Sequence, residues 1–360
     1  MKMPFFLLIG SLIIARRAMI SGMLNPARFR KITGQKLPQS LKLGLPKGNG
    51  NIRIIPFYFQ KFRSGWRKRS TTFMTVKQPD EHIIEAIGRS RIVIRDGIIV
   101  EVGEARIREC PLAKRFAHPV PKINKDAVRA NIEERMKSFG MCTSRRDVID
   151  TKEFVGFGAT ELLGFASRTG LIDAAVLACD GAGTVIVKKP ALIQGVGGRM
   201  SGLVSTSPIK EVIQRIEENG GIVVDKKHAS LDQFRGVKRA YKEGCKKVAV
   251  TVARPEVAEK IRKAYPDAII FGVHVTGLTR EEAESMVASA DLMTACASNT
   301  VREVAGAKAL LQAGVSVPIF ALTKRGKEII IEKIRQTEEQ VLIKPTRLPI
   351  LDGQQPDPLV

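Results

Sequence analysis

From about residue 153 onward, continuous apolar runs alternate with amphipathic segments, and this alternation constrains the fold more than any other feature. The apolar runs are short and rich in Val, Ile and Ala, without regular polar residues between them. Strands of that kind are buried on both faces, which is typical of a parallel sheet. The sequence therefore predicts an α/β fold over residues 151–340, with a mostly parallel sheet covered by helices on both faces.

The predicted elements follow one another regularly along this domain. Strands are expected at residues 173–179, 184–187, 221–225, 246–253, 267–277, 290–298 and 317–323. Helices are expected at residues 158–170, 207–220, 230–244, 254–266, 279–289, 299–314 and 324–336. Ser207 before Pro208 predicts one helix start, and Thr279 with Glu282 predicts a capping box at another.

A smaller N-terminal α+β segment is expected over residues 74–150, before this alternation begins. Asp96-Gly97 is a strong turn pair between two β-branched runs and predicts a hairpin. The elements expected here are a helix-like piece at 80–88, the hairpin at 90–104, and a helix at 124–141 between an Asn124 N-cap and Gly140. At the other end, the Pro-rich residues 341–360 predict an irregular tail.

The formal net charge of +23 is concentrated in the first fifth of the chain. Residues 1–73 hold 15 Lys and Arg and no Asp or Glu, whereas residues 74–360 hold 44 basic and 36 acidic residues. Net charge indicates binding to nucleic acid or membranes rather than fold. The folded part is only mildly basic, so we expect it to bind no nucleic acid.

Residues 1–73 form a basic leader or arm that has three interpretations. The apolar run at 4–15 is too short to span ~30 Å of hydrocarbon as a helix, and two arginines follow where a cleavage site would be expected. The segment fits a basic arm for nucleic acid or acidic lipid, a membrane-targeting leader, or translated upstream sequence. The change to ordinary composition at Met74 favours the third. We therefore expect residues 1–73 to be disordered or not native, a natural start at Met74, and no membrane span.

Five cysteines, an odd number without close pairs, do not form a disulfide framework and indicate a reducing, cytoplasmic compartment. All except Cys245 lie beside Gly, Pro or a turn. Their spacing contains no CxxC pattern, so spacing alone does not support a metal site. Two interpretations stay open for Cys142, Cys179 and Cys296: packed thiols, or a shared metal or redox role.

The carboxyl ends of the predicted strands are where a ligand would bind, because parallel strands bring these ends to one edge of the sheet. Cys245 precedes a strand and belongs to the opposite edge. The residues that follow strand ends are Cys179, Asp180, Asp225, Arg254, His274, Cys296, Ser298, Asn299, Thr323 and Lys324.

The stretch "ACDGAGTV" after the first of these strands has two interpretations. Asp180-Gly181 is a good turn pair, and Gly183 also relieves crowding, which fits a simple hairpin. The same glycines would also let a ligand approach the backbone beside the Cys179 thiol and the Asp180 carboxylate. We treat Cys179, Asp180 and Cys296 as candidate catalytic residues, with Gly181 and Gly183 as candidate ligand-binding residues.

Two further segments are candidate anion sites. The loop at 193–202 has four glycines and Arg199, although it matches neither the dinucleotide-binding nor the Walker spacing. It is either a flexible connection or an anion-binding loop, with Gly195, Gly197, Gly198 and Arg199 as the binding residues.

The second candidate lies where a strand passes into the helix expected at 299–314. The amides of the first helical turn can bind an anion near Ser298 and Asn299, or Asn299 or Thr300 can simply cap the helix. His274, at another strand end, completes the candidate ligand-binding residues.

Five motifs occur in a characteristic order: "FGMCT", "DAAVLACDGAGTVIV", "IQGVGGRMSGLV", "VAVTVA" and "ADLMTACAS". In this order they resemble methanogenesis marker protein 8, over about residues 80–340. That is a family of unknown biochemical function from methane-producing archaea, whose gene occurs together with that of methyl-coenzyme M reductase. The resemblance implies a role in the maturation, modification or activation of that enzyme, and it supplies no catalytic residues.

The leading hypothesis is a cytoplasmic accessory protein that assembles, modifies or reductively activates methyl-coenzyme M reductase. Cys142, Cys179 and Cys296 would bind a metal or take part in thiol redox chemistry; the cofactor is unknown, with an iron–sulfur cluster or another metal as the hypothesis. The predicted partner is methyl-coenzyme M reductase or its activation machinery. Two alternatives are a non-catalytic docking or assembly factor and an enzyme that binds a phosphorylated ligand at the glycine-rich loop. Whether the chain is an enzyme stays open.

Overall fold

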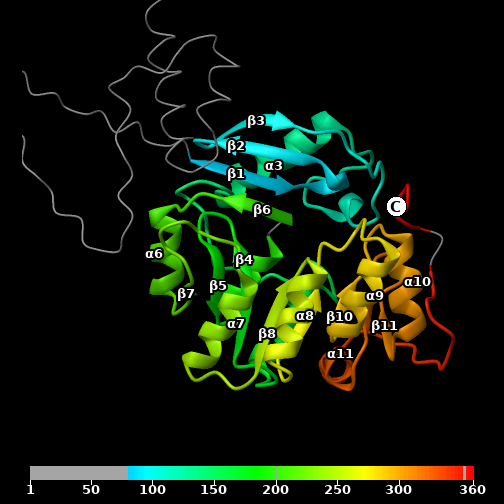
Figure 1. Cartoon of the computed structure of the whole chain (residues 1–360). Coiled ribbons are helices and arrows are strands. Elements are labelled where there is room, and N and C mark those ends of the chain that lie inside the picture. The colour runs from blue at the N-terminus through cyan, green and yellow to red at the C-terminus, as the bar shows by residue number, and fades with distance from the viewer. Residues whose placement is uncertain (1–79, 200–201, 352–353) are drawn as a thin grey trace, which may run out of the picture. The chain divides into compact units, whose positions relative to one another are not determined.

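The computed structural model describes residues 80–199, 202–351 and 354–360 of the 360-residue chain (Figure 1). The described residues all belong to one compact unit, which is assigned to residues 74–360. The predictions for residues 1–73, including the start at Met74, lie outside the described residues.

An antiparallel four-stranded sheet, in the order β3-β2-β1-β6, is formed mainly by the N-terminal segment. Its strands are β1 (Glu81–Glu85), β2 (Arg91–Arg95), β3 (Ile98–Val102) and β6 (Gly202–Thr206). Helix α3 (Lys125–Phe139) packs against it through Val128 and Ile132. The predicted hairpin is confirmed as β2–β3, and α3 has the predicted Asn124 N-cap and a left-handed Gly140 with φ 75°.

The helix expected at residues 80–88 is wrong, because residues 81–85 form strand β1. This strand pairs with β2 on one side and with β6 on the other. Its side chains alternate between half-buried and buried, so His82 and Ile84 point into the protein. The two β-branched isoleucines suit this half-buried surface, and pairing with β6, distant in sequence, decides the conformation.

The larger sheet has the order β11-β12-β10-β9-β8-β4-β5-β7. Its strands are β4 (Ala174–Cys179), β5 (Gly183–Val187), β7 (Ile222–Val223), β8 (Val248–Val252), β9 (Ile269–Gly272), β10 (Leu292–Thr294), β11 (Leu311–Ala313) and β12 (Ile319–Ala321). The mostly parallel sheet that we expected is therefore right only for its centre. Strands β4, β8, β9 and β10 are parallel, whereas the strand pairs on both flanks are antiparallel.

The reason for this difference is that an apolar strand buried on both faces looks the same in either direction. Only three residues separate β4 from β5, and a connection that short makes a hairpin, since a parallel crossover needs about a dozen residues or more. The antiparallel flanks therefore depend on connection length and not on strand composition.

Helices cover both faces of the larger sheet, as predicted (Figure 1). On one face lie α4 (Ala159–Arg168), α5 (Pro190–Ile193), α6 (Lys210–Glu218) and α11 (Lys324–Gln336). On the other lie α7 (Gln233–Lys242), α8 (Pro255–Ala264), α9 (Arg280–Ser289) and α10 (Asn299–Lys308). Short helices η2 (Ile87–Arg89), η3 (Ala113–Arg115) and the π-helical η4 (Gln194–Gly198) complete the described elements.

The ends of three helices can be compared with their predicted positions. The Thr279–Glu282 capping box of α9 is confirmed. The Ser207 cap is wrong: its hydroxyl donates to the Glu81 carbonyl, and α6 begins only at Lys210. The helix expected at 299–314 ends at Lys308, and β11 follows it. Among the described helices, none has the length and apolar character needed to cross a membrane.

Candidate functional site

The "CDGAG" stretch is the turn of the β4–β5 hairpin, in which Cys179 pairs with Gly183. Both glycines have left-handed φ angles, 77° at Gly181 and 70° at Gly183. A Cβ atom on Gly183 would lie 2.2 Å from the carbonyl oxygen of Ala229. The glycines therefore serve the turn and the close approach of another backbone segment.

Asp180, the first residue of this turn, is fully buried and binds residues 142–146, which lie earlier in the chain. Its carboxylate accepts hydrogen bonds from the Cys142 amide at 2.6 Å and from Nε of the buried Arg146 at 2.9 Å. Burial alone would raise the pKa of Asp180, but the Arg146 charge and these hydrogen bonds hold it below its usual value. Asp180 is therefore an ionised structural anchor.

Arg146 extends this anchor to the glycine-rich segment. Its Nη2 donates to the carbonyl oxygens of Gly195 at 3.2 Å and Val196 at 3.4 Å. Its guanidinium also lies over the Phe139 ring, 5.0 Å from the centroid. The guanidinium thus has partners on several sides, which a buried charge requires.

The two thiols beside Asp180 are protonated packing groups. Cys142 and Cys179 are both fully buried in the protein. Burial, reinforced by the charge of Asp180, raises the pKa of Cys179 to about 12 and raises that of Cys142 well above its usual value. A thiol needs its thiolate form for nucleophilic attack or metal binding, so neither residue has the electrostatics of a reactive cysteine.

The glycines of the 193–202 loop let other parts of the chain pack close to the backbone of this loop. A Cβ on Gly195 would lie 2.1 Å from the Val148 carbonyl oxygen, and one on Gly197 would lie 2.2 Å from Cγ2 of Thr160. Within this segment, residues 194–198 form the π-helical η4. Close packing thus accounts for these two glycines.

Arg199, the proposed anion ligand of this loop, contacts two carboxylates. Its Nε donates to Asp150 at 2.8 Å and its Nη1 to Asp147 at 3.2 Å. At the start of α10, Ser298 is the N-cap and accepts from the Val301 amide at 3.3 Å. The amide of Asn299 donates to Val360 at 2.9 Å. The chain itself therefore occupies the groups expected to bind anions.

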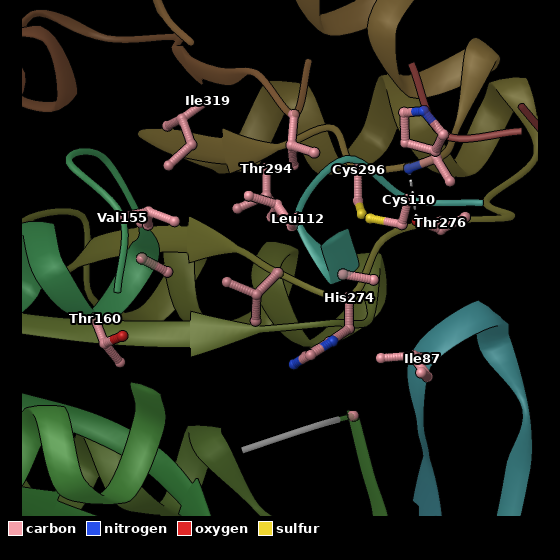
Figure 2. A pocket seen from close by; sticks show the side chains of 18 of the residues that line it. Ile87, Cys110, Leu112, Val155, Thr160, His274, Thr276, Thr294, Cys296 and Ile319 are labelled. Carbon is pink, nitrogen blue, oxygen red and sulfur yellow. Dashed lines mark hydrogen bonds between the residues drawn. The ribbon is translucent and has the colours of Figure 1, made fainter. Parts of the chain in front are cut away.

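A cavity of about 830 Å³ lies at the carboxyl ends of the parallel strands. Side chains at the ends of β8, β9 and β10 line it together with residues after β1 and β3, among them Ile87 and Leu112 (Figure 2). The lining includes Thr251, Ala253, Val273, His274, Thr294 and Cys296 from strand ends, and Ile87, Arg89, Ile107, Cys110 and Leu112 from the N-terminal segment. A cavity of this size suits an organic ligand or cofactor.

Only some of the predicted site residues line this cavity. They are Gly197, His274 and Cys296. The cavity lining does not include Cys142, Cys179, Asp180, Gly181, Gly183, Gly195, Gly198, Arg199, Ser298 or Asn299. Among residues 80–199, 202–351 and 354–360, no three His, Cys, Asp or Glu side chains come together as a metal-binding group. Of the three cysteines that we grouped, Cys296 lines the cavity, whereas Cys142 and Cys179 do not.

The cavity contains a pair of cysteines, Cys110 and Cys296, whose sulfurs point toward one another (Figure 2). Both are free thiols and half-buried. Interaction with the Cys296 thiol lowers the pKa of Cys110 to about 6, and the same interaction, together with burial and the Cys110 charge, raises the pKa of Cys296 well above its usual value. Arg302 nearby also lowers both values. At neutral pH the pair is therefore a Cys110 thiolate beside a Cys296 thiol.

Arg302 forms hydrogen bonds with the backbone around Cys296. Its side chain is buried, and its Nη2 donates to the carbonyl oxygens of Cys296 at 2.6 Å and Ser316 at 2.7 Å. Its Nε donates to Ala295 at 3.0 Å. These bonds fix the backbone between β10 and α10, and the guanidinium places a positive charge close to the thiols.

His274 faces the cavity from the end of β9. Its backbone is left-handed, with φ 54°, which is uncommon for a residue with a Cβ and concentrates at functional sites. The side chain is accessible from the cavity but lies deep among protein atoms, and this burial lowers its pKa. The imidazole is therefore neutral at pH 7 and able to donate or accept a proton.

Arginines give the cavity a positive lining. The lining includes three arginines, Arg89, Arg115 and Arg135, and two glutamates, Glu85 and Glu339; the Arg89 side chain pairs with Glu85 at 3.3 Å. Burial lowers the pKa of Arg135 to about 10, so it still carries its charge at neutral pH. The balance favours a ligand with an anionic group.

Cys110 is the site residue that sequence reasoning missed. It lies in "ECPL", before a proline, in a segment without periodicity. The sequence signal for Cys110 was its position beside a turn. Cys142, Cys179 and Cys296, which we grouped instead, have the same signal. Its pairing with Cys296, 186 positions further along the chain, follows only from the packing of the two sheets.

The fold and the cavity define an α/β protein with a cysteine pair at the carboxyl edge of its sheet. By sequence comparison, residues 82–335 match the model of a family described as uncharacterized protein conserved in archaea (DUF2099), and the chain belongs to that family. It is also 43% identical over 284 residues to uncharacterized protein MJ0054 of Methanocaldococcus jannaschii. This match covers 78% of the chain and all of the relative.

Among solved structures, a chain of the F420-reducing [NiFe] hydrogenase complex from Methanosarcina barkeri, studied by xenon derivatization, is similar at 14% identity. The match covers 49% of this chain and 72% of the other, with a TM-score of 0.26. A likeness at that level carries no argument about fold or function.

Proposed function

We propose that this chain is a dithiol redox protein whose reactive centre is the Cys110–Cys296 pair. The observation behind this proposal is that two thiols face each other inside a ligand-sized cavity, and one of them has a pKa of about 6. The thiolate is the nucleophile in thiol–disulfide exchange, and a thiol with a pKa near the ambient pH attacks fastest. Cys142 and Cys179 lack these properties.

The chemistry is the reduction of a disulfide by the cysteine pair. The Cys110 thiolate attacks one sulfur of the substrate disulfide, forms a mixed disulfide and releases the first substrate thiolate. Cys296 loses its proton and attacks the Cys110 sulfur, which releases the second thiolate. Two electrons pass from the pair to the substrate, and two protons convert the released thiolates to thiols. The reverse sequence oxidises a dithiol substrate.

Three other cavity features assist this exchange. His274, neutral at pH 7 and part of the same cavity lining, is the group that we propose takes up the proton lost by Cys296 and returns it to a leaving thiolate. Arg302 stabilises the negative charge on the cysteine pair through its nearby guanidinium. The arginines of the lining favour a substrate that carries carboxylate or phosphate groups.

The biological role that we propose is an accessory function in methanogenesis. The protein would assemble, modify or reductively activate methyl-coenzyme M reductase, which is its proposed partner. The support is the ordered set of sequence motifs that resembles methanogenesis marker protein 8, together with the relative in Methanocaldococcus jannaschii. A cysteine pair in a cavity is suited to a reductive step in such a role.

Redox titration of protein purified without oxygen tests the chemical part. The full chain is equilibrated in glutathione buffers of varied ratio, and free thiols are counted by mass after alkylation. Wild type is expected to gain and lose one disulfide reversibly. Cys110→Ser and Cys296→Ser abolish this transition, whereas the control Cys245→Ser, at a buried thiol outside the cavity, retains it.

The cellular part requires a methanogen that expresses each variant in place of its own copy. Lower methyl-coenzyme M reductase activity in both cavity variants, with normal activity in Cys245→Ser, is the expected result. Full activity in Cys110→Ser and Cys296→Ser would contradict the redox role and support a non-catalytic docking factor instead.

A further inference from the structure

The C-terminal residues 354–360 lie against the cavity that holds the cysteine pair. Pro356 belongs to the cavity lining, and the chain end lies near α10 and the N-terminal segment (Figure 1). Residues 341–351 and 354–360 form no helix or strand, apart from one isolated bridge at Asp357. The segment nevertheless makes specific hydrogen bonds on both sides of the cavity.

One side of the segment binds the backbone immediately before Cys110. Asp357 forms an antiparallel bridge with Glu109. Its carbonyl oxygen accepts from the amides of Arg108 at 2.6 Å and Glu109 at 3.0 Å, and its own amide donates to Glu109 at 3.0 Å. Cys110 therefore directly follows a segment that is held to Asp357 by three backbone hydrogen bonds.

The other side of the segment binds the backbone immediately after Cys296. The Val360 amide donates to the carbonyl oxygen of Ala297 at 2.8 Å, and the Asn299 amide donates back to Val360 at 2.9 Å. Cys296 is thus adjacent to a second contact with the same short segment.

A side-chain contact joins the segment to the support of Cys296. Nη1 of the buried Arg302 donates to the side-chain oxygen of Gln355, while its Nη2 donates to the Cys296 carbonyl oxygen. The Gln355 amide group donates in turn to Val315 at 3.3 Å. Gln355 therefore helps to orient the guanidinium that lies nearest to the thiol pair.

In the part of the chain that the structure describes, the backbone around Cys110 and the backbone around Cys296 share no direct hydrogen bond. Among the backbone hydrogen bonds of the described residues, none joins residues 108–112 to residues 294–299. The segment 354–360 bonds to both, so it is the backbone link that bridges them. Movement of either backbone segment would change the separation of the two sulfurs, on which the interaction between the thiols depends.

We propose that residues 354–360 are a positioning strap that holds Cys110 and Cys296 together and sets their redox equilibrium. The inference rests on the proposed dithiol function. Gln355 and Arg302 act through the cysteines and are positioning residues, with no role in bond making. Without the strap, Cys110 loses its interaction with the Cys296 thiol, and its pKa returns toward the value of an ordinary cysteine near 8.5.

Two variants of the full chain and a matched control test the strap. Gln355→Ala removes the contact with Arg302, and deletion of residues 354–360 removes the whole segment. Gln354→Ala is the control, since Gln354 is exposed and adjacent. The readouts are the equilibrium constant with glutathione and the pH profile of Cys110 alkylation; circular dichroism and thermal melting monitor folding.

The deletion is expected to move the alkylation midpoint from about pH 6 toward 8.5 and to change the equilibrium constant by at least about tenfold, or roughly 30 mV. Gln355→Ala is expected to shift the alkylation midpoint and the equilibrium constant in the same directions as the deletion does. The change in the equilibrium constant is expected to be about threefold. Gln354→Ala matches wild type. Should the deletion variant fail to fold, the shift in Gln355→Ala decides the matter.

Two failures are distinguishable in this design. If wild type forms no reversible disulfide between Cys110 and Cys296, the proposed function falls and the strap with it. If wild type forms it but Gln355→Ala and the deletion behave like Gln354→Ala in both readouts, the strap is wrong and the dithiol centre stands.

Discussion

Two pairs of cysteines in this protein occupy opposite electrostatic settings. Cys142 and Cys179 lie fully buried beside the anionic Asp180, and Cys110 and Cys296 lie half-buried in a cavity close to Arg302. Burial next to a carboxylate raises the pKa of a thiol, and a donor thiol with a nearby guanidinium lowers it. Position beside a turn, which both pairs share, therefore says little about reactivity.

The buried pair belongs to a structural anchor, and removal of its carboxylate is expected to have the largest effect. Asp180→Ala leaves the buried Arg146 charge without its partner, which should lower the free energy of unfolding by about 3–5 kcal/mol. Asp147→Ala, at an exposed partner of Arg199, should cost less than about 1 kcal/mol. Denaturant titrations of both variants make the comparison, and equal small losses would show that Asp180 is no anchor.

The same anchor predicts a dependence on pH. Because the folded-state pKa of Asp180 lies below its unfolded value, the contribution is fully present above about pH 4–5 and is lost as pH falls through the folded pKa. Wild type should therefore lose stability on acidification more steeply than Asp180→Ala. Parallel slopes between pH 5 and 2 would contradict this assignment.

The next largest effect is expected at Gly183, which follows Asp180 in the β4–β5 hairpin. Gly183→Ala adds a Cβ at φ 70°, 2.2 Å from the Ala229 carbonyl oxygen, and should cost about 2–4 kcal/mol. Gly170→Ala has a similar φ of 72° but open space, so it should cost about 1 kcal/mol. Thermal melting of the two variants separates crowding from backbone strain; equal losses would mean that the close approach is unimportant.

The cavity pair is expected to show itself in the rate of thiol labelling. With a pKa of about 6, Cys110 is mostly thiolate at pH 7, whereas an ordinary cysteine is only a few per cent thiolate. Iodoacetamide should modify Cys110 first, about tenfold faster than an exposed free cysteine. Cys142 and Cys179 should react only after unfolding. Mass-spectrometric mapping over time checks the order, and early labelling of Cys179 would reverse the comparison.

The smallest effect is expected at His274. His274→Gly relieves the left-handed backbone and should leave stability unchanged or raise it by up to about 1 kcal/mol. At the same time it should slow disulfide exchange, since the proton carrier is lost. Stability measured by denaturant and exchange measured with a disulfide probe should move in different directions, and a large loss of stability would assign His274 to the fold alone.

Much of the fold was predictable because its signals are local. The capping box at Thr279, the Asn124 N-cap and the turn at Asp96-Gly97 each depend on neighbours within a few residues. The location of the cavity at the carboxyl edge followed from the parallel centre of the sheet. These features needed no knowledge of distant contacts.

What the sequence did not reveal depends on contacts between distant segments. Residues 81–85 became a strand through pairing with β6, more than 100 positions away, and this pairing buried His82. The hydroxyl of Thr206 contacts His82 at 2.6 Å and accepts from the Gly181 amide at 2.8 Å. The same kind of long-range packing brought Cys110 to Cys296.

Disulfide mapping of the oxidised protein tests the central claim most directly. The full chain, purified without oxygen and then oxidised with an excess of glutathione disulfide, is alkylated, digested without reductant and analysed by mass spectrometry. The account predicts a single linked peptide pair that contains Cys110 and Cys296, removed by dithiothreitol and restored by re-oxidation. A link between Cys142 and Cys179, or five free thiols under conditions that oxidise an ordinary dithiol, would contradict it.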